Sequence, residues 1–117
     1  MSPLPRNQLL KGTTDLLVLA TLEPERLHGY DILQRIRAAG RELTLSEGAL
    51  YPTLHRLEAR GAIAGAWEEG SSGPRRRYYS LTDAGRGLLS EARSEWEQFV
   101  ADVDAVASSR SRETSNA

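Results

Sequence analysis

The chain has 117 residues, of which 39% are hydrophobic and 26% are charged, with a net charge of −1 and no cysteine. This length suits one domain and is short for two. The absence of cysteine excludes disulfides, thiolate catalysis and thiolate zinc sites, and it is compatible with a reducing cytosol. The net charge argues against a nucleic-acid partner, but the charges are unevenly placed. Residues 1–87 hold twelve Lys and Arg against ten Asp and Glu, whereas residues 88–117 hold three against six.

The first predicted helix spans about residues 6–22 and ends at Glu23-Pro24. Its apolar run over 16–22 is far shorter than the ~20 residues that span a bilayer, so we expect a soluble, unexported protein. The C-terminal end of this helix is apolar nearly all round, which predicts burial on all sides. One small domain can hardly provide that alone, so the helix indicates a partner.

The second predicted helix spans residues 29–39 and ends at Gly40. Its apolar residues recur at helical spacing: Tyr30, Ile32, Leu33 and Ile36. A short polar link over 41–45 then leads to a third helix. Two helices joined in this way predict a helix-turn-helix.

The third predicted helix begins with Ser46 as its N-cap and ends before Gly61. Its predicted buried face consists of Leu50, Leu54 and Leu57. Its opposite face shows Glu47, Gly48, Tyr51, Pro52, His55 and Arg56. Donors, a flat ring and small groups suit a helix that enters a major groove, although a lone helix with these residues would more simply have an ordinary polar face.

After Gly61 the spacing of apolar residues changes from about 3.6 residues, typical of a helix, to 2 residues, typical of a strand. Residues 63–69 and 77–82 alternate, and GSSGP over 70–74 is a turn sequence, so a β-hairpin is predicted. Arg75, Arg76 and Arg77 lie at its tip and returning strand. An isolated run of arginines is commonly a solvated loop, but next to a helix-turn-helix it can reach phosphates from the same side. We expect Trp67 to lie in the core.

The last predicted helix covers residues 83–107, with Thr82 as its N-cap, and the tail 108–117 is expected to be disordered. A helix of this length is roughly 37 Å long, about the width of a small domain. It carries one apolar stripe: Leu88, Leu89, Ala92, Trp96, Phe99, Val100, Val103, Val106 and Ala107. Because part of the stripe must project, we expect it to pack on the same helix of a second chain.

Catalytic motifs are missing from the sequence. His28 and His55 are the only histidines, and neither has a metal ligand at i+4 or a phosphate loop nearby. We therefore expect no enzyme activity, no cofactor and no metal. The predicted fold is α+β, mostly helical with a small hairpin: a winged helix-turn-helix over 1–82 and a dimerisation helix over 83–107. The rival function is a winged-helix protein–protein module, and a membrane-surface role is weaker because the last helix has an acidic polar side.

Four segments resemble the PadR family of bacterial transcriptional regulators: KGTTDLLVLATLE, LHGYDILQRI, LSEGALYPTLHRLEARGAI and GPRRRYYSLTDAGR. They cover most of residues 11–87, in the order and spacing of the family. The resemblance implies a cytoplasmic protein, associated with the nucleoid when bound to DNA. It also implies a homodimer built from the first and last helices, which binds a palindromic operator, usually as a repressor. The single C-terminal helix resembles the short subfamily.

Carried over by position, residues 46–60 form the recognition helix and 69–77 the wing. The implied DNA-binding residues are Ser46, Glu47, Gly48, Tyr51, Pro52, His55, Arg56, Arg75, Arg76 and Arg77. The expected dimer interface comprises Leu16, Leu19, Leu89, Trp96, Phe99, Val100 and Val103. In some short members a flat aromatic effector lies near a tryptophan at the position of Trp96. The alternative is that Trp96 is a large interface anchor.

Overall fold

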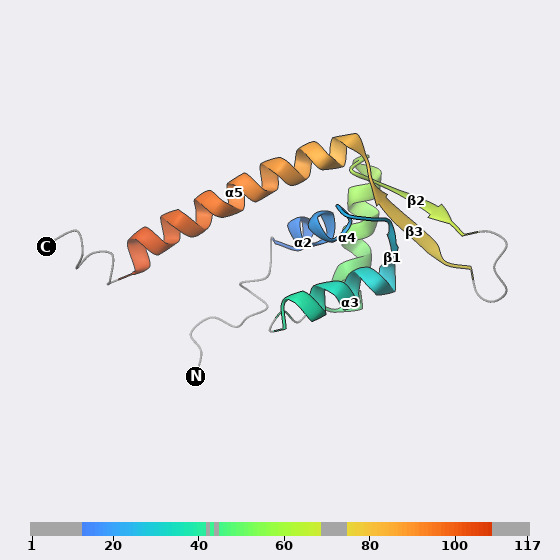
Figure 1. Ribbon diagram of the computed structural model, residues 1–117, viewed down its shortest axis with the longest axis horizontal. Helices are drawn as coiled ribbons and strands as arrows, with labels where there is room; N and C mark the ends of the chain where they lie inside the picture. Colours follow the sequence, from blue (N-terminus) through green and yellow to red (C-terminus); the bar gives the residue numbers. More distant parts are fainter. Residues whose placement is uncertain (1–12, 42, 44, 69–74, 109–117) are drawn as a thin grey trace, which may run out of the picture.

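The computed structural model describes residues 13–41, 43, 45–68 and 75–108 (Figure 1). In chain order the elements are α2 (Thr14–Thr21), β1 (Leu27–His28), α3 (Gly29–Ala39), α4 (Glu47–Ala59), β2 (Ile63–Trp67), β3 (Arg77–Leu81) and α5 (Asp83–Ala107). Predictions for residues 6–12, for the turn 70–74 and for the tail 109–117 lie outside the described residues. None of the described helices is long and apolar enough to cross a membrane.

Helices α3 and α4 form the predicted helix-turn-helix, and their ends are where the sequence places them. The Ser46 hydroxyl accepts a hydrogen bond of 3.2 Å from the Ala49 N–H, which confirms it as the N-cap of α4. Gly61 follows α4 with φ +78°, the left-handed conformation that glycine adopts without strain. The cap and the glycine thus fix the limits of α4.

The core is made of one face from each helix and the inner face of the sheet. Leu50, Leu54 and Leu57 of α4 are fully buried, as predicted. They pack in one cluster with apolar residues of α2, α3, the sheet and the start of α5: Val18, Leu19, Ile32, Leu33, Ile36, Ile63, Tyr79, Leu81 and Leu89. Tyr30 was predicted on the buried stripe of α3, but its side chain is 56% exposed. That prediction was wrong, because the core covers only Ile32, Leu33 and Ile36 on this helix.

The predicted hairpin is part of a three-stranded antiparallel sheet with the order β1-β3-β2. In it Ile63 pairs with Leu81 and Trp67 pairs with Arg77. The additional strand β1 has two residues, with Leu27 opposite Tyr79. Trp67 is 49% exposed, so its assignment to the core was wrong. It ends β2, beyond the part of the strand that the helices cover.

The junction between the sheet and α5 is tightly packed. Thr82 caps α5, since its hydroxyl accepts from the Gly85 N–H at 3.0 Å, and the same hydroxyl donates to the Gly61 carbonyl at 2.6 Å. A Cβ on Gly85 would lie 1.9 Å from the Ala62 carbonyl oxygen. The first turn of α5 therefore rests directly on the backbone that follows α4.

We expect Gly85→Ala to lower the free energy of unfolding by about 2 kcal/mol or more, because the added methyl group would overlap the Ala62 carbonyl, which accepts two hydrogen bonds from Thr82. Gly87→Ala is the matched control. A Cβ there meets nothing within 4 Å, so alanine should stabilise the helix by about 0.5–1 kcal/mol. Chemical denaturation of both variants measures the two effects. Equal stability of the two would contradict this packing.

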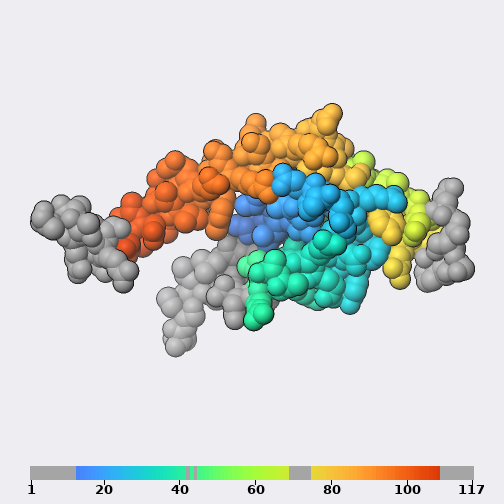
Figure 2. All heavy atoms as spheres, in the orientation of Figure 1, coloured from blue at the N-terminus to red at the C-terminus, as the bar shows by residue number. Residues whose placement is uncertain are grey.

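Helix α5 begins beside the end of α4, passes over α2 and then extends beyond the body of the chain (Figures 1 and 2). A bidentate ion pair joins α5 to the residues just after α2, with Arg93 donating to Glu23 at 2.8 and 3.1 Å. The hydrogen bonds from Arg93 hold the pKa of the Glu23 carboxyl below its usual value. The ionised carboxylate therefore stabilises the fold at pH values above the pKa that Glu23 has in the unfolded chain. This stabilisation is lost as the pH falls through the lowered pKa of the folded chain.

Two residues predicted at the dimer interface are already buried in the single chain. Leu19 is 0% and Leu89 is 1% exposed, so neither offers side-chain surface to a second chain. Leu16 is partly buried against the same core. The sequence analysis took the apolar residues of α2 as a sign of a partner chain. In the structure α2 packs against α3, α4 and α5 of its own chain, which cover most of these residues.

Candidate nucleic-acid interface

The outer face of α4 consists of the residues that the sequence predicted: Glu47, Gly48, Tyr51, Pro52, His55 and Arg56 are all exposed, as is the cap residue Ser46. The Tyr51 ring lies over the first residue of α3. A Cβ on Gly29 would be 2.9 Å from Cε1 of Tyr51, so a larger residue here would push the Tyr51 ring away. Gly29, in the HGY segment at residues 28–30, thus has a packing role that the sequence alone did not reveal. It lets the Tyr51 ring contact the start of α3 and so join α3 and α4.

Arg56 is less free than the sequence suggested. Its guanidinium is ion-paired with Asp15 of α2, and Arg60 Nη1 lies 3.9 Å from the other carboxylate oxygen. Both arginines keep about half of their side-chain surface, at 51% and 53% exposed. Asp15 therefore orients this edge of α4 and links it to α2 without burying the arginines.

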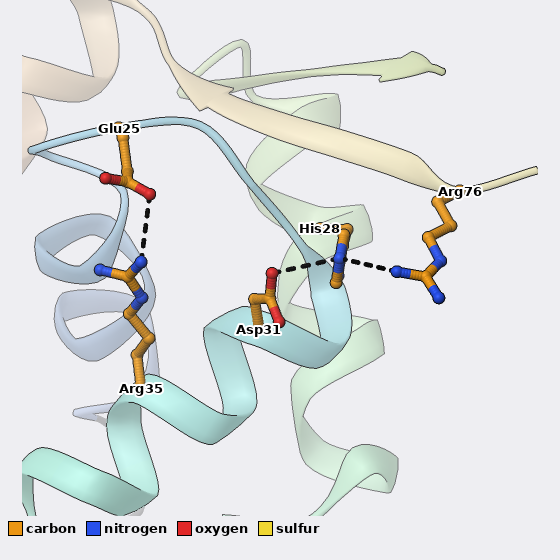
Figure 3. A network of polar contacts seen from close by, with 5 residues as sticks. All are labelled: Glu25, His28, Asp31, Arg35 and Arg76. Atoms are coloured by element: carbon orange, nitrogen blue, oxygen red, sulfur yellow. Dashed lines mark hydrogen bonds and ion pairs between the residues drawn. The ribbon is translucent and has the colours of Figure 1, made fainter. Parts of the chain in front are cut away.

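The wing arginines, Arg75, Arg76 and Arg77, have three different environments. Arg75 is exposed, and its guanidinium lies 5.1 Å from the centre of the Trp67 ring. Arg76 is also exposed, with Nη1 3.3 Å from Nε2 of His28. The same histidine nitrogen lies 3.1 Å from Oδ2 of Asp31, so the start of α3 contacts the wing (Figure 3).

Arg77 points back onto the protein. It donates to Glu58 of α4 at 2.5 Å, and its guanidinium lies 5.5 Å from the Trp67 ring and 5.9 Å from the Tyr79 ring. A Cβ on Gly65 would be 2.6 Å from Arg77 Nε, so the side chain runs across the middle of β2. Burial raises the pKa of the Tyr79 phenol beneath it. Arg77 thus joins the sheet to α4.

A pocket of about 510 Å³ lies where α3, α4 and the described part of the wing meet. Four aromatic residues line it, Tyr30, Tyr51, Trp67 and Tyr79, and its cationic side consists of the wing arginines beside His28 and His55. None of the described lining residues is acidic. The predicted DNA-binding residues Tyr51, His55 and Arg75 to Arg77 are therefore brought together. Arg56 lies outside this group, on the α2 side.

Sequence reasoning missed Trp67, Tyr30 and His28 as members of this surface. Their signal is weak, because an aromatic residue in an apolar stripe or a strand is more often core. Within the described residues, no three His, Asp or Glu side chains lie close enough together to hold a metal ion. The surface combines cations and flat rings, which suits binding of a polyanion rather than chemistry on a substrate.

The model of the transcriptional regulator PadR-like family matches residues 18–91. The chain belongs to this family. It is 36% identical to the transcriptional regulator Rv3488 of Mycobacterium tuberculosis, over 80% of this chain and 84% of that protein. These relatives are regulators rather than enzymes, as the sequence predicted.

Solved structures of PadR-family regulators resemble the fold. One from hypervirulent Clostridium difficile has a TM-score of 0.68 at 36% identity, covering 80% of this chain and 95% of that one. One from Eggerthella lenta has a TM-score of 0.77 at 31% identity, covering 89% of each chain. The winged-helix fold and the long C-terminal helix predicted from the sequence are confirmed.

Proposed function

We propose that this PadR-like regulator is a homodimeric repressor that binds a palindromic operator. In this proposal residues 1–82 bind DNA, with the outer face of α4 in the major groove and Arg75 and Arg76 on phosphates. Residues 83–107 join the two chains. The protein then acts in the cytoplasm and is associated with the nucleoid when bound to DNA.

One observation carries the proposal: the exposed Tyr51 and His55 of α4 border the same pocket as the exposed Arg75 and Arg76 of the wing. A helix that reads base edges needs neighbouring cations that hold the phosphate backbone in register. Two such helices related by a twofold axis must lie roughly 34 to 36 Å apart to read successive major grooves. A long α5 from each chain can set that spacing.

A mobility-shift assay with the DNA upstream of its own gene tests this function. We expect a shift that survives an excess of random DNA, because base contacts add to the phosphate contacts. A shift that random DNA removes would contradict an operator. No binding even at low salt would favour a protein–protein module instead.

Pro52 tests how α4 sits in the groove. A proline inside a helix costs roughly 3 kcal/mol, and Pro52 is exposed on the proposed DNA face. We expect Pro52→Ala to keep or raise the free energy of unfolding while it changes operator affinity. Thermal unfolding and fluorescence anisotropy measure the two quantities. If affinity is unchanged, the proline is only a tolerated irregularity.

Trp96 is the predicted place for a small aromatic effector that would release the operator. Its ring is 42% exposed and lies 6.3 Å from the ring of Phe99, on the outer part of α5. An effector there could act only by favouring one packing of the two α5 helices over another. Both an effector site and a simple interface anchor fit this position, and the effector stays a prediction.

A further inference from the structure

The pocket between α3, α4 and the wing has more aromatic surface than duplex binding needs. Tyr30, Tyr51 and Trp67 are 56%, 40% and 49% exposed, and all three line this one pocket. In duplex DNA the bases are stacked on one another, so their flat faces are not accessible to a protein surface. The exposed ring of Trp67 therefore fits a ligand whose ring is free.

The cations beside Trp67 are suited to an anion with several oxygens. Arg75 and Arg76 form no ion pair with any described carboxylate, whereas Arg77 is paired with Glu58. Arg75 beside Trp67 and Arg76 beside His28 line the same pocket. Their two guanidiniums together offer more N–H donors than one carboxylate can accept, which suits the three oxygens and the double charge of a phosphate. Guanidiniums also stack on aromatic planes, and those of Arg75 and Arg77 lie 5.1 and 5.5 Å from the centre of the Trp67 ring, so a base that stacks on this ring takes the place of a guanidinium.

The size of the pocket agrees with this chemistry. Its volume of about 510 Å³ lies within the range of roughly 300–1,000 Å³ that is usual for small-molecule sites. Stacking of a base on an aromatic side chain, next to cations that hold the backbone, is how proteins bind unpaired nucleotides. The rings and the two unpaired arginines reproduce both parts of that arrangement.

We propose that this pocket binds a nucleoside phosphate, with the base on Trp67 and the phosphate bound by Arg75 and Arg76. The ligand then takes the two arginines assigned to the DNA backbone, so that nucleotide and DNA compete. This second step rests on the proposed function, whereas the ligand site itself does not.

Tryptophan fluorescence tests the site directly. The chain has two tryptophans, so Trp96→Phe leaves Trp67 as the sole reporter. Titration with AMP should quench it to saturation. Adenosine, which has the ring only, and inorganic phosphate, which has the charge only, should each bind at least roughly tenfold more weakly.

The double variant Arg75→Ala/Arg76→Ala in the same background should lose at least about tenfold in AMP affinity. Arg35→Ala is the matched control: Arg35 is an exposed arginine of α3 that pairs with Glu25, away from Arg76 (Figure 3). It should bind AMP as before. No saturable quenching at millimolar AMP, or equal affinity in the double variant, would overturn the site. Saturation-transfer NMR of AMP with the unaltered chain gives the same answer without any substitution.

Competition is measured separately, by anisotropy of a labelled operator with and without saturating AMP. A fall in DNA affinity supports competition, and an unchanged affinity overturns it. Absence of any operator binding counts against the proposed function alone, because the Trp67 titration contains no DNA.

Discussion

Replacing Arg75 and Arg76 with alanine is expected to weaken binding to operator and to random DNA alike. Each arginine on a phosphate releases counterions, so the slope of log affinity against log salt should fall by about 2 per half-site. Both side chains are exposed and neither is paired with a described carboxylate, so both are available to phosphates. Anisotropy over a salt series measures the slope. An unchanged slope would show that the wing does not contact DNA.

Arg77→Ala is the informative comparison within the same tripeptide. Arg77 is ion-paired with Glu58 at 2.5 Å and its side chain is only 30% exposed. Its loss should leave the salt slope nearly unchanged and should instead lower stability, because the Glu58 carboxylate and the Trp67 ring lose their partner. If Arg77→Ala reduced the salt slope as much as the replacement of Arg75 and Arg76, then Arg77 would also contact DNA, and its purely structural role would be contradicted.

The fold was largely predictable because its signals are local. Ser46, Gly61 and Thr82 mark helix ends by capping chemistry, and Leu50, Leu54 and Leu57 mark a buried face by spacing. Strand β1 was missed, since its two residues, Leu27–His28, are too few to show a period. A strand that exists only through its pairing with β3 leaves no pattern in its own sequence.

The site was predictable in its residue types but not in its pairings. The sequence shows where the arginines are, but not that Asp15, 41 positions earlier, pairs with Arg56. Nor does it show that Glu58, 19 positions earlier, pairs with Arg77. Such contacts depend on how helices and strands cross, which periodicity does not determine. Trp67 was misplaced for the same reason, because hydrophobicity does not tell where the core ends along a strand.

The dimer interface shows a related ambiguity. Apolar spacing predicts that a residue is covered, but it does not say which chain covers it. Leu19 and Leu89 are covered by their own chain, whereas the outer stripe of α5 is not: Trp96, Phe99, Val100, Val103 and Val106 are between 42% and 77% exposed. Trp96, Phe99, Val100 and Val103 of this stripe belong to the predicted interface, and their own chain leaves them exposed.

Val103→Glu and Trp96→Glu are therefore expected to convert a dimer into folded monomers. Burying an unpaired carboxylate costs about 3 kcal/mol or more, which is at least roughly a hundredfold in dimer affinity. Light scattering should give the mass of one 12.9 kDa chain instead of two. Circular dichroism should stay unchanged, since the core of each chain does not include these side chains.

Ser94→Glu is the matched control, because it adds the same charge to the same helix on the side opposite Val103, where Ser94 is exposed. It should remain dimeric. Monomers made by Val103→Glu should also lose operator binding, since a single half-site has half of the phosphate and base contacts and no partner to fix the spacing. If both Val103→Glu and Trp96→Glu remain dimeric, the dimer interface lies elsewhere. In that case α5 could not set the distance between two recognition helices.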